Sequence, residues 1–420
     1  MPNDNRPSPM EGSPHPGQNK VPDVGYPLAY RRTRLCTFAF FTELVQNACM
    51  KKVLDWLRRV LIGLGIAAAL LVLIIGGYVA YVVVQYDRIP DGTELAFENP
   101  RLPGVETGWE YTIATYNIGF GAYRPTYSFF MDTGTMLDGT EVTGLYGKAE
   151  SREAVQHNTD GVVDELKKLA PDFAFLQEVD ADATRSYHIN QLQQITGAMT
   201  GYGYTFAENF HSAWLHYPLH DPHGKTYAGL LTLSKYRLEG NVRRSYPVDM
   251  GFPTRFFDLD RCFSVHRVPV DNGRDLVLIN SHMSAYDKGG VIRTQQLEML
   301  NQVAAEEYAK GNYVIIGGDF NHALGKTSAH AFPSRQQFPE WVFILTDDDL
   351  APGFRIVAAD NETEVPTCRT AEIPYEKGVN FTTVVDGFIV SDNVKARADN
   401  VDTDFAYSDH QPVLLRFELE

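Results

Sequence analysis

Beyond residue 110, apolar positions either alternate with polar ones or gather in short runs. Residues 111–117 alternate like a strand, and residues 173–178 form a short apolar run that ends in a carboxylate. Apolar side chains three to four residues apart predict helices over 149–170 and 291–310. Strands interleaved with helices predict a layered α/β domain. Further predicted strands are 229–233, 276–282, 313–317, 384–390 and 412–419.

One segment is far more apolar than the rest. Residues 60–84 include 25 positions without a charge, and a helix of that length spans a hydrocarbon core of about 30 Å. The alternatives are a core helix, which is rarely apolar on every face, and a signal peptide, whose apolar part is usually ~7–15 residues long. Arg58 and Arg59 precede the segment and Asp87 follows it. The positive-inside rule predicts a single-pass protein of the cell membrane, with its N-terminus cytoplasmic and the chain from about residue 85 outside.

This segment divides the chain into four predicted parts. Residues 1–59 form a cytoplasmic tail, largely disordered because its beginning is rich in Pro, Asn, Gly and Ser. Met50 is followed by two lysines, like a bacterial start, so the residues before it could belong to an over-extended reading frame. Residues 60–84 cross the membrane, 85–108 form a linker with three prolines, and 109–420 form the outer domain.

Charge is distributed unevenly along the chain. The whole sequence has 37 basic and 53 acidic residues, a net charge of -16. Residues 1–59 hold nine basic and five acidic residues, and 60–84 hold none, so the remainder carries 28 basic and 48 acidic residues, a net of -20. A domain this acidic disfavours non-specific binding of nucleic acid, which depends on basic patches. Four cysteines exclude a disulfide scaffold, although Cys262 and Cys368 could form one bond.

Polar side chains recur where apolar runs end. Each alone could be a helix cap or a structural histidine, but together they indicate a site, because α/β sheets gather their sites at strand ends. Carboxylate and amide oxygens without a nearby cysteine favour magnesium, manganese or calcium over zinc. These residues are Asn117, Glu178, His282, Asp319, Asn321, Asp386, Asp409 and His410.

In their order along the chain, these residues resemble the motifs of the endonuclease/exonuclease/phosphatase superfamily, and the resemblance covers roughly residues 109–420. One departure is Gly387, where many members carry a larger residue. The set is specific for the superfamily and weak for the substrate, because its nucleases, sphingomyelinases and phosphatases share it. The matching motifs are TYNIG at Asn117, LQEVD at Glu178, NSHMS at His282, GGDFN at Asp319 and Asn321, VVDGF at Asp386, and SDHQP at Asp409 and His410.

The resemblance implies a four-layer sandwich, in which two mixed β-sheets pack face to face with helices outside, preceded here by one transmembrane helix. It also implies metal-dependent hydrolysis of a phosphoester bond. Glu178 would be the principal metal ligand, and Asp409 and Asn117 would help to place the ion. The implied cofactor is Mg²⁺, with Mn²⁺ or Ca²⁺ as alternatives.

The resemblance assigns roles to the other matching residues as well. Asp319 would activate or orient the attacking water, and Asn321 would position the phosphate. His282 and His410 would donate hydrogen bonds to phosphoryl oxygens. Asp386 would hold His410 in one tautomer, as carboxylates commonly do for histidines.

Two further features concern the substrate. Arg255, Arg261 and Lys225 stand near aromatic residues and are candidates for binding a phosphate or headgroup, with ordinary salt bridging as the alternative. Two long irregular stretches, 119–148 and 209–228, are rich in aromatic residues. These aromatics either pack the loops onto the domain or form a substrate-binding rim. The histidines of 209–228 lack an acidic or cysteine partner at a spacing typical of zinc sites.

The sequence therefore predicts a membrane-anchored hydrolase that cleaves a phosphodiester or phosphomonoester with a divalent metal. A small or lipid-linked substrate is favoured over duplex DNA, since the basic residues of the outer part are dispersed. One alternative is a surface-anchored nuclease that acts on DNA or RNA with the same site. The other is a non-catalytic binding ectodomain.

Overall fold

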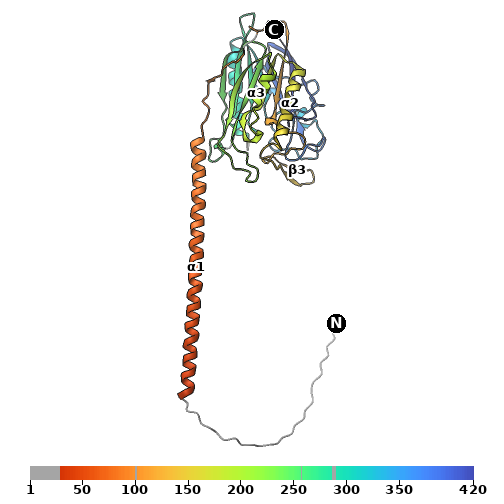
Figure 1. Cartoon of the computed structure of the whole chain (residues 1–420). Coiled ribbons are helices and arrows are strands. Elements are labelled where there is room, and N and C mark those ends of the chain that lie inside the picture. The colour runs from red at the N-terminus through yellow and green to blue at the C-terminus, as the bar shows by residue number, and fades with distance from the viewer. Residues whose placement is uncertain (1–28, 100–101, 257, 286–289) are drawn as a thin grey trace, which may run out of the picture. The chain divides into compact units, whose positions relative to one another are not determined.

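The computed structural model describes residues 29–99, 102–256, 258–285 and 290–420 (Figure 1). The chain divides into two compact units, Met1–Gly77 and Tyr78–Glu420. The first contains most of helix α1 (Ala29–Gln85), and the second contains the end of that helix and all the strands.

Helix α1 is long and apolar enough to cross a membrane over Ala39–Gln85, by length and composition. It begins at Ala29, so residues 29–59 differ from the irregular tail that we expected for 1–59. The reason is that these residues contain no proline or glycine to end a helix. The remainder of that predicted tail, 1–28, lies outside the described residues.

Two mixed β-sheets form the body of the second unit. Within the described residues, one sheet has the strand order β1 (Thr93–Glu94), β8 (Glu239–Ser245), β9 (Cys262–Pro269), β10 (Asp275–His282), β11 (Tyr313–Asp319), β17 (Asp386–Ser391) and β14 (Phe354–Ile356). The other has the order β18 (Val394–Asn400), β19 (Val413–Leu419), β2 (Glu110–Asn117), β5 (Phe173–Ala183), β7 (Thr226–Ser234) and β6 (Gly203–His211). Each sheet has a parallel pair, β10 with β11 and β2 with β5, among antiparallel neighbours.

Short two-stranded pieces decorate these sheets. They are β3 (Thr133–Thr135) with β4 (Glu141–Thr143), β12 (Ala323–Leu324) with β13 (Ile344–Leu345), and β15 (Cys368–Arg369) with β16 (Thr382–Thr383).

Buried apolar clusters show that the elements stack in four layers. Phe175 of β5 and Leu278 of β10 lie in one cluster that fills the space between the two sheets. Helix α4 (Val291–Ala309) covers the outer face of the first sheet through Leu300 and its neighbours. Helices α2 (Arg152–Leu169) and α3 (Gln191–Ala198), which are labelled in Figure 1, cover the second sheet. The predicted α/β class and its two packed sheets with outer helices are confirmed.

Parts of the segment predicted as a linker, 85–108, contact the domain. Strand β1 pairs antiparallel with β8, and the backbone N–H of Val105 donates to the carbonyl of Pro269 at 3.0 Å. Val105 is also buried in the cluster between the sheets. The segment contains apolar side chains besides its prolines. Val105 and Phe97 explain these contacts, because both pack in or against the apolar cluster between the sheets. Cys262 and Cys368 are both free thiols and buried, so the disulfide that we considered between them is not formed.

Candidate active site

Strand register brings the predicted residues of the first sheet into one row. His282 at the end of β10 pairs with Asp319 at the end of β11, and Asp319 pairs with Asp386 at the start of β17. In the second sheet, Asn117 ends β2 and pairs with Gln177, the residue before Glu178. The two sheets therefore present their polar residues at the same edge, where the parallel strands end.

Glu178 owes its orientation to an irregularity in β5. The pairing of β5 with β7 shifts register between Leu176 and Val179, and Glu178 has φ 55°. A positive φ is uncommon for a residue with a Cβ and is typical of functional sites. Burial raises the pKa of the Glu178 carboxyl, and the charge of Asp409 raises it further, although Arg185 opposes both.

Asp319 is the centre of the constellation. Its Oδ2 accepts a hydrogen bond from Asn117 Nδ2 at 3.0 Å and lies 3.4 Å from His282 Nε2 and 3.7 Å from His410 Nε2. Its Oδ1 accepts from the backbone N–H of Asn321 at 2.9 Å. Asn117 Nδ2 also lies 3.4 Å from Glu178 Oε1, so a single amide links the two carboxylates of opposite sheets.

His410 and Asp386 form a buried pair. His410 Nδ1 lies 2.8 Å from Asp386 Oδ2, which leaves Nε2 directed toward Asp319. Burial alone would lower the pKa of His410, but Asp386 and the other nearby anionic groups outweigh it and hold that pKa well above its usual value. Burial raises the pKa of Asp386 to about 6, although His410 pulls it down. The pair therefore carries an imidazolium and a carboxylate at neutral pH.

His282 is held in the opposite state. Arg261 Nη1 lies 2.6 Å from His282 Nε2, and an arginine can only donate, so Nε2 accepts and Nδ1 carries the proton. Nδ1 is buried without a hydrogen-bond partner. Burial and then the charge of Arg261 put the pKa of His282 well below its usual value, so this histidine is neutral.

The donor set fits a hard divalent cation. Burial raises the pKa of both Glu178 and Asp409, and the charge of Asp409 raises that of Glu178 further, so a positive charge placed between them would stabilise both carboxylates. Asp386 Oδ1 is buried without a partner. Among the described residues, the group whose ligand atoms all lie within 4.8 Å of one another is Asp319, Asp386 and His410, which does not include the predicted ligands Glu178 and Asp409. Oxygen donors predominate, which suits magnesium, manganese or calcium.

Asp409 joins this cluster through its neighbour in the SDH motif. The Ser408 hydroxyl donates to the carbonyl of Asn117 at 2.8 Å and also lies 3.2 Å from Asp409 Oδ1. Gly119 explains the close fit, because a Cβ at that position would lie 2.9 Å from Asp409 Oδ1. Asn321, which has φ 51°, is fixed by a hydrogen bond from its Nδ2 to the carbonyl of Met283 at 2.9 Å.

The three predicted substrate-binding cations are dispersed. Arg261 is buried beside His282, with its Nε unpartnered. Arg255 lies against the rings of Tyr86 and Phe256 near the end of α1. Lys225 is exposed, and its backbone N–H donates to the Thr184 hydroxyl at 3.2 Å. Only Arg261 contacts one of the motif residues through a hydrogen bond that the structure describes.

Most aromatic side chains of segment 119–148 pack inward. One buried cluster contains Phe120, Tyr123, Tyr127 and Phe129. These side chains therefore pack the loop onto the domain and do not form a substrate-binding rim. In segment 209–228, His223 is buried, and its Nδ1–H donates to the carbonyl of Gly147 at 2.7 Å. Burial lowers the pKa of His223 to about 3, so it stays neutral.

Sequence patterns did not reveal three buried neighbours of the site. Arg185 pairs with Asp180 at 2.8 Å, stacks on Phe120 at 4.0 Å and acts electrostatically on Glu178. Cys368 Sγ lies 3.7 Å from His410 Nε2. Asp180 follows Glu178 by two residues, beyond the predicted strand 173–178 but within β5, and that spacing was the available signal.

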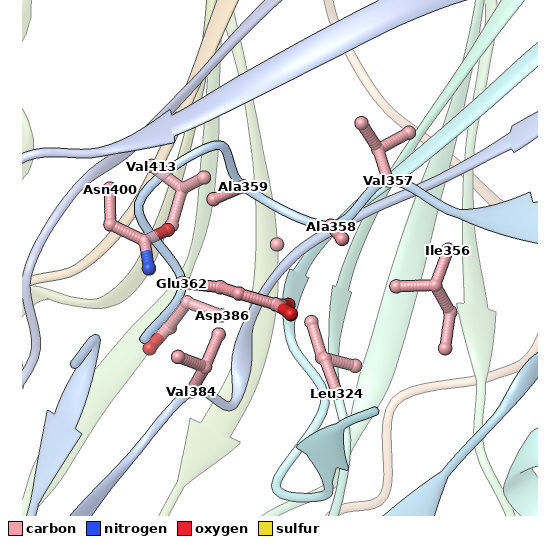
Figure 2. Close-up of a pocket in the computed structure, with 11 residues that line it drawn as sticks. Leu324, Ile356, Val357, Ala358, Ala359, Glu362, Val384, Asp386, Asn400 and Val413 are labelled. Atoms are coloured by element: carbon pink, nitrogen blue, oxygen red, sulfur yellow. The ribbon is translucent and has the colours of Figure 1, made fainter. Parts of the chain in front are cut away.

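A small pocket has Asp386 of the hydrogen-bonded cluster among its lining residues. Figure 2 shows its apolar wall, to which Leu324, Ile356 and Val357 contribute, with Glu362 as a second carboxylate. Gly387 lines the same pocket, and a Cβ there would come within 2.6 Å of the Leu324 side chain. The departure at Gly387 therefore makes room for Leu324 and does not alter the polar cluster.

The chain was compared with known proteins. A model of the endonuclease/exonuclease/phosphatase family matches residues 114–410, and the chain belongs to this family. Proteins of this family are typically metal-dependent phosphoester hydrolases. No curated protein matches the chain.

Solved structures resemble it at low identity. TDP2 from Caenorhabditis elegans is 16% identical with a TM-score of 0.47, over 74% of this chain and 75% of that one. An endonuclease/exonuclease/phosphatase from Beutenbergia cavernae is 17% identical with a TM-score of 0.48, over 74% and 72%. The human Nocturnin catalytic domain with bound sulfate is 17% identical with a TM-score of 0.45, over 78% and 98%.

Proposed function

We propose that this protein is a membrane-anchored, divalent-metal-dependent phosphoesterase that acts on a small or lipid-linked substrate at the outer face of the cell membrane. The observation that carries the proposal is the convergence on Asp319. Asn117, His282 and His410 all lie within 3.7 Å of its Oδ2, although they come from both sheets and are far apart in the sequence. Apolar packing does not explain why four polar motif residues meet at one carboxylate oxygen, so a shared chemical role is the better explanation.

Glu178, Asp409 and Asn117 are the residues that we assign to the metal. All three lie at one end of the second sheet, on or beside β2, β5 and β19, and burial raises the pKa of the Glu178 and Asp409 carboxyls, so a nearby cation would stabilise their charged forms. A bound divalent ion supplies positive charge that neutralises a phosphate and lowers the pKa of water.

The chain's own side chains then have different roles in binding the phosphate and in placing the water. His410 is protonated and aims Nε2 at the centre of the site, so it donates to a phosphoryl oxygen and stabilises charge that develops there. Asp319, hydrogen-bonded by Asn117 and Asn321, orients or activates a water. His282 is neutral and accepts from Arg261, and the unpartnered Nε–H of Arg261 and Nδ1–H of His282 are the donors that remain for a phosphoryl oxygen.

Charge argues for a small or lipid-linked phosphoester. The outer part carries a net charge of -20, and duplex DNA needs several basic contacts to successive phosphates. Within the described site, Arg261 is the cation that contacts a motif histidine, and one buried guanidinium suits a single phosphate group. A long basic track is not required for such a ligand.

Hydrolysis tests separate this proposal from its rivals. Purified full-length protein is assayed with magnesium against a generic phosphodiester, inositol phosphates, sphingomyelin vesicles, RNA and supercoiled plasmid at ~150 mM salt. We expect turnover of a small or lipid-linked ester that exceeds plasmid nicking. Efficient nicking instead would favour a nuclease, and no turnover of any ester would favour a binding ectodomain.

Glu178→Gln provides the internal control for the metal. The change keeps the shape of the side chain and removes its charge, so we expect at least a ~100-fold loss of turnover with the fold intact. Glu208→Gln is the matched comparison, because burial also raises the pKa of Glu208, which lies on β6 beside His211. Normal activity of Glu178→Gln in ordinary magnesium would refute the ligand assignment.

A further inference from the structure

Two loops of the outer unit expose large apolar side chains. One lies between β6 and β7, and the other between β8 and β9. Exposed apolar groups of this size on neighbouring loops mark an interaction surface. We call this set the apolar rim: Trp214 at 37% exposure, Tyr217 at 66%, Leu219 at 85%, Met250 at 47% and Phe252 at 68%.

The rim is joined to the end of helix α1, which belongs to the same compact unit. The Tyr78 hydroxyl donates to the carbonyl of Trp214 at 3.1 Å, and the Tyr81 hydroxyl accepts from the Trp214 backbone N–H at 3.2 Å. Val82 forms one buried cluster with Ala213 of the first loop and Phe256 of the second. Both loops are thus fixed to the final turns of the apolar helix.

The depth of those turns follows from the length of the apolar segment. Its 25 uncharged residues exceed the roughly 20 that cross a hydrocarbon core. A crossing of roughly 20 residues that begins at Val60 ends near Val79. The excess therefore places Tyr81 at the level of the lipid headgroups, where tyrosine and tryptophan are enriched, and Tyr78 one turn below it at the border of the core. Because Trp214 bonds to both tyrosines through its backbone, the rim lies at the same level.

The first loop is also held on its other side. Asp221 Oδ2 accepts from the backbone N–H of Gly147 at 3.0 Å, and Asp221 Oδ1 lies 3.1 Å from Lys148 Nζ. Tyr217 packs edge-on against Phe130, with ring centroids 5.4 Å apart. Contacts on both sides therefore fix the loop that carries Leu219. The exposure of Leu219 follows from this fixed loop conformation.

Both loops leave the sheets at the catalytic edge. Thr226, where β7 begins, pairs with Ala183 at the end of β5, so the first loop lies beyond the end of β5. Phe263 near the start of β9 pairs with Ser281, the residue before His282, so the second loop lies beyond the end of β10. The same edge carries Glu178 and His282, and a surface that receives the rim receives the site as well.

Charge points to the kind of surface. Residues 212–225 and 246–261 together hold four acidic and three basic residues, so the loops have no basic excess to attract anionic lipid. The acidic residues are Asp221, Asp249, Asp258 and Asp260, and the basic ones are Lys225, Arg255 and Arg261. Apolar and aromatic contact with a zwitterionic headgroup region matches this composition.

We infer that the apolar rim lies in the headgroup region of a zwitterionic bilayer and holds the catalytic edge against the membrane. This inference rests on the membrane anchoring that is part of the proposed function, and it narrows the substrate to a phosphoester carried on a lipid of the same leaflet. Thr93 and Glu94 pair with β8 soon after the end of α1, so the chain between the helix and the domain is short.

Spin labels test the inference without any enzymatic readout. The full chain carrying Cys36→Ser and Cys49→Ser is reconstituted in phosphatidylcholine bilayers, and single labels are attached at Leu219→Cys or Phe252→Cys. Cys262 and Cys368 remain because they are buried. We expect oxygen, which concentrates in lipid, to relax both labels more strongly than a water-soluble nickel complex, and high salt to leave this pattern unchanged.

Two control positions make each outcome decisive. Trp109 is 64% exposed and lies just before β2, at the end of the strand opposite to Asn117 and the site. A label at Trp109→Cys should be relaxed by nickel. Leu70→Cys, inside the apolar segment, should be relaxed by oxygen. Nickel relaxation at Leu219 and Phe252 with oxygen relaxation at Leu70 would overturn the rim and leave the anchor. Nickel relaxation at Leu70 would overturn the anchor too, and protection of the rim from both reagents would assign it to a protein partner.

Discussion

At the scale of single residues, the two histidines of the site differ because of their partners. Asp386 supports a positive charge on His410, whereas Arg261 suppresses one on His282. Both side chains are buried, so solvent does not level the difference. Two identical imidazoles are thereby assigned to different chemistry, one as a charged donor and one as a neutral group beside a guanidinium.

Asp386→Asn tests this division. His410 would lose the largest of the charges that raise its pKa, so that pKa should fall. In the parent, protonated His410 persists to a pH well above the usual histidine range and is lost as pH rises through the raised pKa. The variant should lose activity at a lower pH, with a fall of roughly 100-fold or more near neutrality.

The measurement is the pH profile of kcat/KM for parent and variant. Asp392→Asn is a suitable control, because Asp392 follows the end of β17 and lies away from His410. An alkaline limb that stays in place in Asp386→Asn would show that His410 does not act in its protonated form.

At the scale of elements, one helix end carries a backbone strain that can be relieved. Ala170, which ends α2, has φ 46° and ψ 43°, the left-handed conformation in which helices commonly use glycine. A Cβ in that conformation costs on the order of 1 kcal/mol. Ala170→Gly should therefore raise the free energy of unfolding by up to about 1 kcal/mol.

Urea unfolding of the purified chain measures the change. Ala305→Gly within α4 is the matched control, because glycine in a right-handed helix interior lowers stability by about 1 kcal/mol. Destabilisation by both substitutions would mean that the flexibility of glycine in the unfolded chain outweighs the relief at Ala170.

The patterns of the elements show which parts of the site can be predicted from the sequence alone. The apolar runs that end in Asn117, His282 and Asp319 predict strands whose ends meet, and the sheets place these three residues together. The orientation of Glu178 was not predictable, since it depends on a register shift that opposes the simple alternation of β5. The Arg261 contact with His282 joins two residues through tertiary packing and has no spacing signature.

The same limit applies to the boundaries of the apolar helix and the linker. A 25-residue uncharged run predicts a membrane helix, but residues 29–59 are helical for a different reason, the lack of any breaker. Residues 85–108 look like a linker because of their prolines. Pairing of Thr93–Glu94 with β8 depends on a free edge of a sheet that only the folded domain provides.

At the scale of the whole molecule, orientation in the membrane decides which compartment the site faces. Basic residues precede the apolar segment and acidic ones follow it, so the outer unit should lie outside the cell. Cysteine chemistry can test this, because Cys49 stands before the segment and is exposed, whereas Cys262 and Cys368 are buried. Burial raises the pKa of the Cys262 thiol to about 11 and that of Cys368 to about 12, so neither reacts readily.

Glu141→Cys places an exposed thiol on β4 of the outer unit, in a chain that also carries Cys36→Ser. A membrane-impermeant maleimide added to intact cells should label this thiol, and Cys49 should react only after the membrane is permeabilised. A chain that carries Cys36→Ser but lacks Glu141→Cys controls for leaky cells, because its Cys49 should not be labelled while the membrane is intact. The reverse pattern would place the carboxylate cluster in the cytoplasm, where a lipid of the outer leaflet could not reach it, and the substrate would then have to be sought on the inner leaflet.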